Sequence, residues 1–433
     1  MKKTVNHILA AGLLALLSLA SCTDEFIEGN DLQGVDRDKR VEVRLPFGVG
    51  RGITTTITTR AAGGEIDYDS QLSGVMAFVY EAKSDNPEEN ELLAYHLFSN
   101  PSNKPLEGAT GGWIADNDDP TCGEIKFYVP VGDVYIYLLG NAQSSFLNFF
   151  PGVSGGDALG TQAEFFEKAT PKWNGNIHSV DGYLPLTGMV NNNTGLCHVN
   201  EQGQISYTDE EGKTHTLLPD GKHDEDNSCV LKRLMSKITM NIREGKGVKF
   251  TARDYTVRHI PHYVSPTAQA WTEEERDRIL VEDAKPVNFG LLDSLTFTIY
   301  LPENIRKVRS GVEITEYRQR DKVVKTADNK NTEETAPDDF HADNADNHKG
   351  HYKFEFAPKA STYIELTGWF ENADKTVAAD VRYYIHLGNF GKDLNHFSVE
   401  RDHHYTYNVT INGVDDIVVE VEDENEKTPG AEG

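Results

Sequence analysis

The sequence predicts an all-β protein built from two domains, and three observations support this. The chain has 433 residues, more than one hydrophobic core usually serves. Tyrosine, threonine and valine recur in short runs that alternate with polar residues, which is the pattern of half-buried strands. Glycine is abundant, with 37 residues, and it suits the turns that many short strands require. We therefore expect strands to be the main elements of both domains.

The charge of the chain excludes one class of partner. Acidic residues number 69 and basic residues 42, which gives a net charge of −27. A protein that binds nucleic acid needs a basic face to neutralise phosphates, and no stretch of the sequence offers one. The acidic balance instead suits a well-hydrated protein in an extracellular setting.

The N-terminus predicts export. Lys2 and Lys3 precede the apolar run 8–20, which is shorter than the roughly 20 residues of a membrane-spanning helix. We therefore expect a cleaved signal peptide over residues 1–21. The run ends in LASC, which resembles the lipobox of bacterial lipoproteins, and this resemblance implies cleavage before Cys22 and lipidation of Cys22. The alternative is an ordinary secretory signal followed by an incidental cysteine.

Three cysteines remain after Cys22, namely Cys122, Cys197 and Cys229. An odd number in an exported chain leaves at least one thiol unpaired. Their spacing is not that of a zinc site. Two interpretations stay open: buried structural thiols, or one incidental disulfide.

Residues 22–60 are expected to form a tether and a leader strand. Residues 23–40 are polar and charged, as in a flexible connection. The next run, VEVRLPFGV, alternates apolar and other residues, so one face of the strand is apolar. Pro46 cannot donate to a strand ladder, which favours an edge position. The apolar face consists of Val41, Val43, Leu45, Phe47 and Val49.

A lone basic residue follows this strand. The threonine-rich run 53–59 is either a second strand or an extension of the first, and it ends at Arg60. Ala61, Ala62, Gly63 and Gly64 follow, and such small residues keep a joint extended and accessible to proteases. The alternative is that Arg60 is an ordinary surface arginine beside a loop.

We expect the N-terminal β-sandwich domain to span residues 61–243. The run 72–82 predicts a buried strand, and 124–142 predicts two strands joined by the turn PVGD. Residues 145–215 are expected to be rich in loops, with a short helix at 161–169. The run 229–242 is ambiguous, because its first part has helical spacing and its second part alternates.

The C-terminal β-sandwich domain is expected to span residues 244–433 and to consist of further alternating runs. A short helix is expected near 272–280, and residues 321–350 are expected to form an acidic, mobile loop. Two alternating runs close the domain, separated by Asn412-Gly413, a strong turn signal. The apolar positions of these runs are Tyr405, Tyr407, Val409 and Ile411 in the first and Ile417, Val419 and Val421 in the second.

No motif predicts catalysis, a cofactor or a metal site. The sequence contains no G-x-S-x-G or H-E-x-x-H, and the GVGRG at 48–52 lacks the spacing of a dinucleotide loop. The histidines and aspartates between His341 and His351 lie in an acidic low-complexity stretch. His403 and His404 are adjacent in a strand, so they face opposite ways and cannot bind one ion together. We therefore expect a protein that is not an enzyme.

Several stretches, in one order along the chain, resemble the fimbrillins, the type V pilins of Bacteroidia. They are LASC, TTRAAGGE, FYVPVGDVYIYLLGNA, LPLTGMV, LKRLMSKITMNI, FTIYLPEN and NHFSVERDHHYTYNVTINGVDDIVVEV. The resemblance covers nearly the whole chain, and each piece is weak while the ordered set is fairly specific. It implies a lipoprotein precursor at the outer membrane with two transthyretin-like β-sandwich domains.

The resemblance also implies a way of assembly. An arginine-specific protease at the cell surface would cut between Arg60 and Ala61 and remove the leader strand. A donor strand from another subunit, either a copy of this chain or a different pilin, would then fill the vacated place. The two C-terminal runs are the expected donor, with simple pairing inside their own domain as the alternative.

Two functions follow from this sequence. The first is a fimbrial subunit that polymerises by strand exchange and serves adhesion and biofilm formation. The second is an uncleaved, monomeric surface lipoprotein, an anchor or adhesin, that binds glycan or a host protein. Four tryptophans are candidate ligand platforms for the second function, although most are expected in the cores: Trp113, Trp173, Trp271 and Trp369. The sequence does not identify a receptor.

Overall fold

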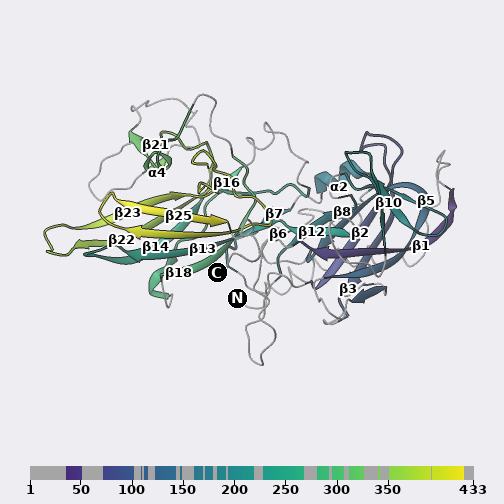
Figure 1. The fold of residues 1–433 in the computed structure, drawn as a ribbon, viewed down its shortest axis with the longest axis horizontal. Coiled ribbons are helices and arrows are strands. Elements are labelled where there is room, and N and C mark those ends of the chain that lie inside the picture. Colours follow the sequence, from purple (N-terminus) through teal and green to yellow (C-terminus); the bar gives the residue numbers. More distant parts are fainter. Residues whose placement is uncertain are drawn as a thin grey trace, which may run out of the picture.

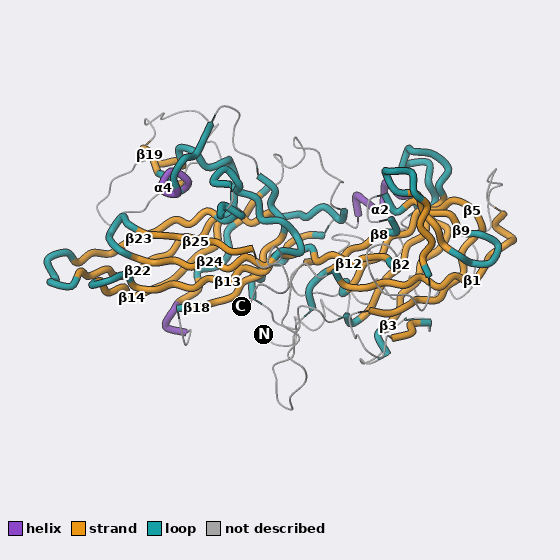
Figure 2. Tube along the Cα trace, viewed as in Figure 1, coloured by secondary structure: helices purple, strands orange, loops and turns teal. Residues whose placement is uncertain are grey.

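The strands form two bodies that lie end to end along the longest axis of the molecule (Figure 1). The first body contains a ten-stranded sheet whose strands lie between β1 and β12 in the sequence. The second body contains the sheets formed by β13 to β25. In the described residues the helices are short: α2 Gln162–Lys168, η2 Phe289–Leu291 and α4 Tyr317–Arg320. The prediction of an all-β fold is confirmed, as the strands that dominate Figure 2 show.

The computed structural model describes the chain in separate stretches. These are residues 36–50, 72–101, 109, 112–115, 122–142, 147–148, 160–168, 171–178, 183–191, 194–218, 228–267, 280–291, 295–306, 312–325, 340–341, 351–391 and 393–423. The predicted signal peptide, the run 53–59 and residues 272–279 of the expected second helix lie outside them.

The first body is one ten-stranded sheet that returns on itself. Its main order is β1-β12-β8-β5-β9-β10-β11, and β1 also pairs with β5. Because β1 contacts both β12 and β5, the sheet folds over into two layers around a buried apolar cluster. Its strands are β1 Asp36–Val49, β2 Gly74–Glu81, β3 Leu92–Ser99, β4 Trp113–Ala115, β5 Cys122–Gly140, β8 Leu186–Met189, β9 Leu196–Val199, β10 Ile205–Thr208, β11 Thr214–Leu217 and β12 Cys229–Arg233.

β5 corrects one prediction. The sequence predicted two strands joined by a turn at PVGD, but Cys122–Gly140 is a single strand of 19 residues. Gly132 has a φ of 129°, which only glycine adopts readily, and the strand changes neighbours there. Residues before Gly132 pair with β1, and residues from Val134 onward pair with β2. The two halves do not form a hairpin because each has another partner.

The stretch 145–215 contains more strand than predicted. The expected helix is confirmed as α2, but β8, β9, β10 and β11 join the main sheet. The strands β6 Leu147–Asn148 and β7 Lys172–Trp173 form a separate pair. These strands have two to four residues each, too short for a period-two pattern to stand out in the sequence.

The ambiguous run 229–242 is strand throughout, apart from one residue. β12 ends at Arg233, Leu234 follows, and β13 spans Met235–Glu244. β13 pairs with β18 and β24 of the second body, whereas β12 pairs with β1 and β8 of the first. We therefore propose that the domains divide at Leu234 and not at the predicted boundary of 243/244.

The second body contains two four-stranded sheets with apolar side chains of both in one core. Their orders are β18-β13-β24-β25 and β17-β14-β22-β23. Ile238 and Tyr407 of the first sheet and Tyr255 and Leu366 of the second belong to the same buried cluster. This is a β-sandwich. The strands are β14 Val248–Arg258, β17 Val287–Asn288, β18 Thr296–Pro302, β22 Tyr363–Asn372, β23 Ala378–His386, β24 His404–Ile411 and β25 Ile417–Asp423, beside the small pair β15 Ile260–Pro261 and β16 Val281–Glu282.

The predicted loop 321–350 contains two strands. β19 Val323–Lys325 and β20 Phe340–His341 both pair with β21 His351–Phe354. The helix α4 precedes them, and its Arg320 is fully buried. The Arg320 guanidinium donates hydrogen bonds to the carbonyls of Leu387 and His396, both at 3.0 Å. Residues 326–339 and 342–350 lie outside the described residues.

Candidate functional site

The predicted leader strand β1 lies between β5 and β12. Residues from Arg40 to Gly48 run antiparallel to β5, and Phe47 to Val49 run parallel to β12. We call the positions of β5 and β12 that contact β1 the β1 site. Pro46 lies opposite Glu124 of β5, just before the ladder with β12 begins. Up to Pro46, β1 pairs with β5 alone among the described strands, as expected for an edge position. Its last residues also pair with β12, so the prediction of an edge is wrong for them.

The apolar face of β1 is deeply buried. Val43, Leu45 and Phe47 are each 0% exposed, whereas Val41 and Val49 are half-buried at the two ends of the run. The Phe47 ring meets Trp113 edge to face, with 4.9 Å between ring centroids. All five predicted side chains thus contact the first core, and three of them are completely withdrawn from water.

β1 carries three cations that contact oxygens of the body, and the exposed Glu42 lies between two of them. Arg44 Nε lies 3.1 Å from Oε2 of Glu124. Arg40 donates to the carbonyl of Leu93 at 3.3 Å, and Lys39 forms an exposed ion pair with Glu201. The Lys39 ammonium lowers the pKa of Glu201. Of these three oxygens, only that of Glu124 belongs to the β1 site, since Leu93 lies in β3 and Glu201 follows β9.

The end of β1 contacts the second body. The Gly50 amide donates to the carbonyl of Leu231 at 2.8 Å. Nη1 of Arg233 donates to the Gly50 carbonyl and to Oδ1 of Asp402, each at 2.8 Å. Asp402 lies in the turn just before β24, so one guanidinium joins the end of β1 to the start of the terminal strands.

A glycine permits β1 to pass close to the loop between β9 and β10. Gly203 has a φ of 75°, and a Cβ there would lie 2.1 Å from the carbonyl oxygen of Glu42. No side chain fits in that space. Sequence reasoning did not identify Gly203, because its partner lies far away along the chain.

The predicted donor strands occupy different positions in their sheet. β24 is central, with β13 parallel on one side and β25 antiparallel on the other. Its side chains Tyr405, Tyr407, Val409 and Ile411 are fully buried. β25 pairs with β24 alone in the described part of the chain. Val419 of β25 is buried, and Ile417 and Val421 are half-buried.

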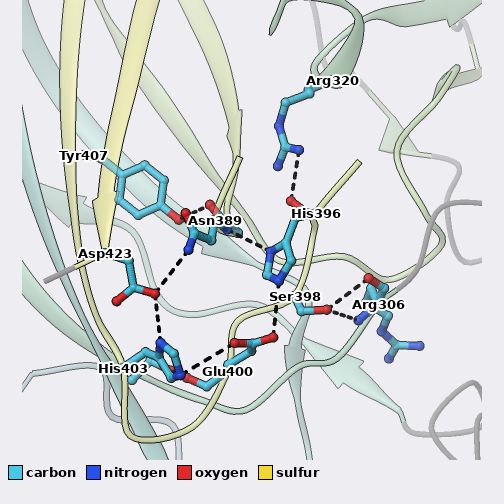
Figure 3. A network of polar contacts seen from close by, with 11 residues as sticks. Arg306, Arg320, Asn389, His396, Ser398, Glu400, His403, Tyr407 and Asp423 are labelled. Atoms are coloured by element: carbon cyan, nitrogen blue, oxygen red, sulfur yellow. Dashed lines mark hydrogen bonds and ion pairs between the residues drawn. The ribbon is translucent and has the colours of Figure 1, made fainter. Parts of the chain in front are cut away.

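A polar network holds the end of β25 (Figure 3). Asp423 Oδ2 lies 2.9 Å from His403 Nδ1 and accepts a hydrogen bond from Asn389 Nδ2 at 3.2 Å. Glu400 continues the network to His396 Nε2, at 3.2 Å. Burial lowers the pKa of His403, but Asp423 and Glu400 outweigh this and raise it overall. The contact with His396 lowers the pKa of Glu400.

Other predicted residues lie apart from these sites. Cys22, Arg60, Ala61 and Trp271 are outside the described residues. Trp173 is buried, and Trp369 is 42% exposed on β22. The thiols of Cys122, Cys197 and Cys229 are buried, and none of them forms a disulfide. No cluster able to hold a metal ion occurs among the described residues.

None of the helices in the described ranges combines the length and the apolar character needed to cross a bilayer.

Comparisons with known proteins give distant similarities. Residues 299–409 match a family model described as Domain of unknown function (DUF4906). Among solved structures, the chain is similar to the tip fimbrial protein Mfa3 from Porphyromonas gingivalis, at 13% identity and a TM-score of 0.42, covering 89% of this chain and 99% of that one. No curated protein matches the sequence.

Two further structures are similar at the same level. The fimbrial anchor protein Mfa2 from Porphyromonas gingivalis has 8% identity and a TM-score of 0.31, covering 89% of this chain and 97% of that one. A candidate cell adhesion protein from Parabacteroides distasonis has 10% identity and a TM-score of 0.45, covering 89% of this chain and 98% of that one.

Proposed function

We propose that this chain is a fimbrial subunit of the fimbrillin type, a cell-surface protein that assembles by exchange of a strand. It is exported as a lipoprotein, held in the outer membrane through Cys22, and cut after Arg60 by an arginine-specific protease. The leader strand β1 then leaves, and a donor strand takes its place. The polymer serves adhesion and biofilm formation, and no step requires a catalytic residue of this chain.

One observation carries the proposal, namely the way β1 fills the β1 site. A segment close to the N-terminus supplies three fully buried side chains to a core that is otherwise built by residues 72–231. Burying these three side chains contributes roughly 5–9 kcal/mol, at about 1.5–3 kcal/mol for each, and the half-buried Val41 and Val49 add less. A body without β1 exposes that apolar surface and two unpaired strand edges, which favours addition of another strand.

The lipid anchor and the cut explain the order of events. Acyl chains on Cys22 bind the bilayer at about 0.8 kcal/mol per buried CH₂, so several chains hold the precursor firmly. A cut between Arg60 and Ala61 separates the body from β1 and from the lipid together. The donor is the C-terminal end of a neighbouring subunit, and in this chain β25 is the terminal strand with a free edge in the described residues.

The first test is the N-terminus of the protein recovered from the cell surface, identified by peptide mass spectrometry. An N-terminus at Ala61 is the expected result, and Arg60→Ala should leave an acylated precursor that does not assemble. Arg51→Ala is the matched control, because it removes an arginine from the same connecting segment and should leave processing intact. Normal polymers formed by the Arg60→Ala protein would refute the proposal.

A second candidate function is an uncleaved surface lipoprotein, an anchor or adhesin that binds glycan or a host protein. The contact of Arg233 with the Gly50 carbonyl favours it, because it fixes the end of β1 to the body. Both terminal strands are also paired inside their own sheet. An acylated Cys22 as the sole N-terminus, with no filaments, would select this function.

A further inference from the structure

Four polar side chains connect the end of β1 with the end of β25. The Arg233 guanidinium donates to the Gly50 carbonyl and to Oδ1 of Asp402. Asp402 is followed directly by His403, whose Nδ1 lies 2.9 Å from Oδ2 of Asp423, the last residue of β25. The contacts therefore lead from the leader strand to the terminal strand without a gap. We call Arg233, Asp402, His403 and Asp423 the relay.

β1 shields the first contact of the relay from water. The side chains of Arg233 and Asp402 are only 2% and 11% exposed while β1 is in place. Gly50 lies against Asp402, because a Cβ at position 50 would be 3.0 Å from Oδ2 of Asp402. When the end of β1 leaves, Arg233 loses a hydrogen-bond acceptor and water reaches the ion pair. An ion pair in water contributes much less than one that is shielded from it.

Asp402 fixes the turn from which β24 begins. Its amide donates to the Met235 carbonyl at 3.1 Å, and its carboxylate accepts a hydrogen bond from the Arg233 amide at 3.3 Å. The next residue, His403, is the one that contacts Asp423. A movement of Asp402 therefore changes how His403 meets the end of β25.

β25 is held less firmly than β24. β24 is paired on both sides and buries four large side chains, whereas β25 pairs with β24 alone among the described strands. Of the apolar side chains of β25, Val419 is buried and Val418 is 47% exposed. An edge strand with few buried side chains opens locally at a lower free energy than the core does. The contact of Asp423 with His403 is thus a substantial part of what holds the end of β25.

We propose that the end of β1 keeps β25 in place through the relay, so that departure of the leader loosens β25 and makes it available to a neighbouring subunit. The inference rests on the proposed function and adds its regulation: an uncut subunit holds its donor strand, and a cut one releases it. Subunits therefore assemble only after processing. The effect is reciprocal by linkage, so loosening the end of β25 weakens the binding of the leader by the same factor.

The test compares two leader peptides that differ by one residue. The chain from residue 22 onward, with Cys22→Ser and a specific protease site introduced around Arg60, is cut, and an excess of peptide replaces the leader. One peptide covers residues 36–50 and the other residues 36–49, and both end in an amide group.

The two peptides isolate one contact. Both fill the apolar positions of the β1 site, since these end at Val49. The terminal amide group of the shorter peptide can still donate to the Leu231 carbonyl, as the Gly50 amide does in the intact chain. The longer peptide alone offers the Gly50 carbonyl to Arg233.

Hydrogen exchange of β25 gives the readout. With the longer peptide bound, we expect the amides of β25 to exchange at least about fivefold more slowly than with the shorter one, the lower end of typical coupling between sites. β23, the edge strand of the opposite sheet, is the internal reference, and its exchange should not differ. Equal exchange of β25 with both peptides would overturn the relay and leave the fimbrial function intact.

Asp423→Asn tests the far end of the relay. It should weaken binding of the longer peptide by about the same factor and leave binding of the shorter one nearly unchanged. Glu420→Gln is the matched control, because it neutralises a carboxylate of the same strand that is 64% exposed and lies outside the relay. An equal loss for both peptides would assign Asp423 a general role in the fold and contradict the coupling.

A measurement on the uncut chain does not depend on peptide exchange. Arg233→Met should speed exchange of β25 relative to β23, whereas Lys39→Met, which removes an exposed ion pair at the other end of β1, should not. Equal acceleration of β23 and β25 by Arg233→Met would overturn the relay. Failure of both peptides to enter the cut chain would mean that β1 is not replaceable, and the fimbrial function would fail.

Discussion

Arg233 and Asp402 form a buried ion pair at the junction of the two bodies, with 2.8 Å between Nη1 and Oδ1. The same nitrogen donates to the carbonyl of Gly50 at the end of β1. Burial raises the pKa of Asp402, although the nearby guanidinium opposes this. The Arg233 guanidinium of β12 therefore links the leader strand β1 to the residues before β24.

We predict that Arg233→Met and Asp402→Asn each lower the free energy of unfolding by about 3–5 kcal/mol, because each leaves a buried group without its partner. Asparagine tolerates the positive φ of 60° at position 402. The double variant should lose less than the sum of the two. Denaturant unfolding of all four proteins measures the coupling, and strictly additive losses would contradict the pair.

Phe47→Ala should destabilise the protein by about 3–5 kcal/mol, because it removes a fully buried ring that packs on Trp113. Val49→Ala is the comparison within the same strand, and it should cost about 1 kcal/mol because Val49 is half-buried. Urea unfolding of the uncleaved protein gives both values. Equal losses would show that β1 does not contribute to the core as described.

Gly203→Ala should loosen β1, whereas Gly212→Ala should not. Both glycines have positive φ, 75° and 81°, so the backbone strain is matched. A Cβ at 203 would meet the Glu42 carbonyl at 2.1 Å, and a Cβ at 212 meets nothing within 4 Å. Limited proteolysis of β1 should therefore accelerate in the first variant alone, and identical rates would contradict the close approach.

Three buried thiols report whether β1 leaves. Cys229 lies beside Phe47 in the parallel ladder, and Cys122 lies opposite Gly48 in the antiparallel one. Their alkylation should accelerate at least about tenfold once the cut leader is displaced, since burial suppresses thiol reactivity. Cys197 is the comparison, because its ladder partner is Val134 of β5 and not a residue of β1. Uniform labelling of all three would indicate unfolding and not strand release.

His403 should make the end of β25 sensitive to pH. Its pKa in the folded protein is raised above the usual 6.5, so its contribution to stability is complete below that value and is lost as the pH rises through the folded pKa. The loss of unfolding free energy in His403→Gln should be larger at about pH 5.5 than at about pH 9. A difference that does not change with pH would contradict the charged contact with Asp423.

Period-two patterns in the sequence identified β1 and the terminal strands correctly. In β1, the alternation of Val43, Leu45 and Phe47 with polar residues predicted the buried face, because one-sided burial imposes that period directly. β24 shows the same relation, with Tyr405 and Tyr407 inside. Where a strand is long and buried on one side only, the local sequence is enough to predict which side chains are buried.

β5 and the junction at Leu234 could not be predicted in this way. The residues around Gly132 have the composition of a turn. They form one continuous strand because the residues on either side of Gly132 pair with different and distant strands, β1 and β2. The run around Leu234 satisfies two patterns at once, and pairing with β24, far along the chain, settles it as strand.

The polar contacts were equally hidden. Arg233 and Asp402 are separated by 169 positions, and nothing in either local sequence indicates a buried ion pair. His403 was noticed only as one of two adjacent histidines, although its neighbours Glu400 and Asp423 make it titrate above its usual value. Such sites arise from tertiary packing, which brings charges together after the strands have formed.

The single residue between β12 and β13 has a mechanical consequence. The long strands of the second body run along the longest axis of the molecule (Figure 1), and the fully buried Leu234 is the one residue between β12 and β13. Tension applied along that axis passes directly from β12 to β13, because no longer linker between them can extend first. It loads the hydrogen bonds of neighbouring strands in shear, so that many must break together before the molecule extends. A molecule of this design would transmit pulling force as a stiff rod.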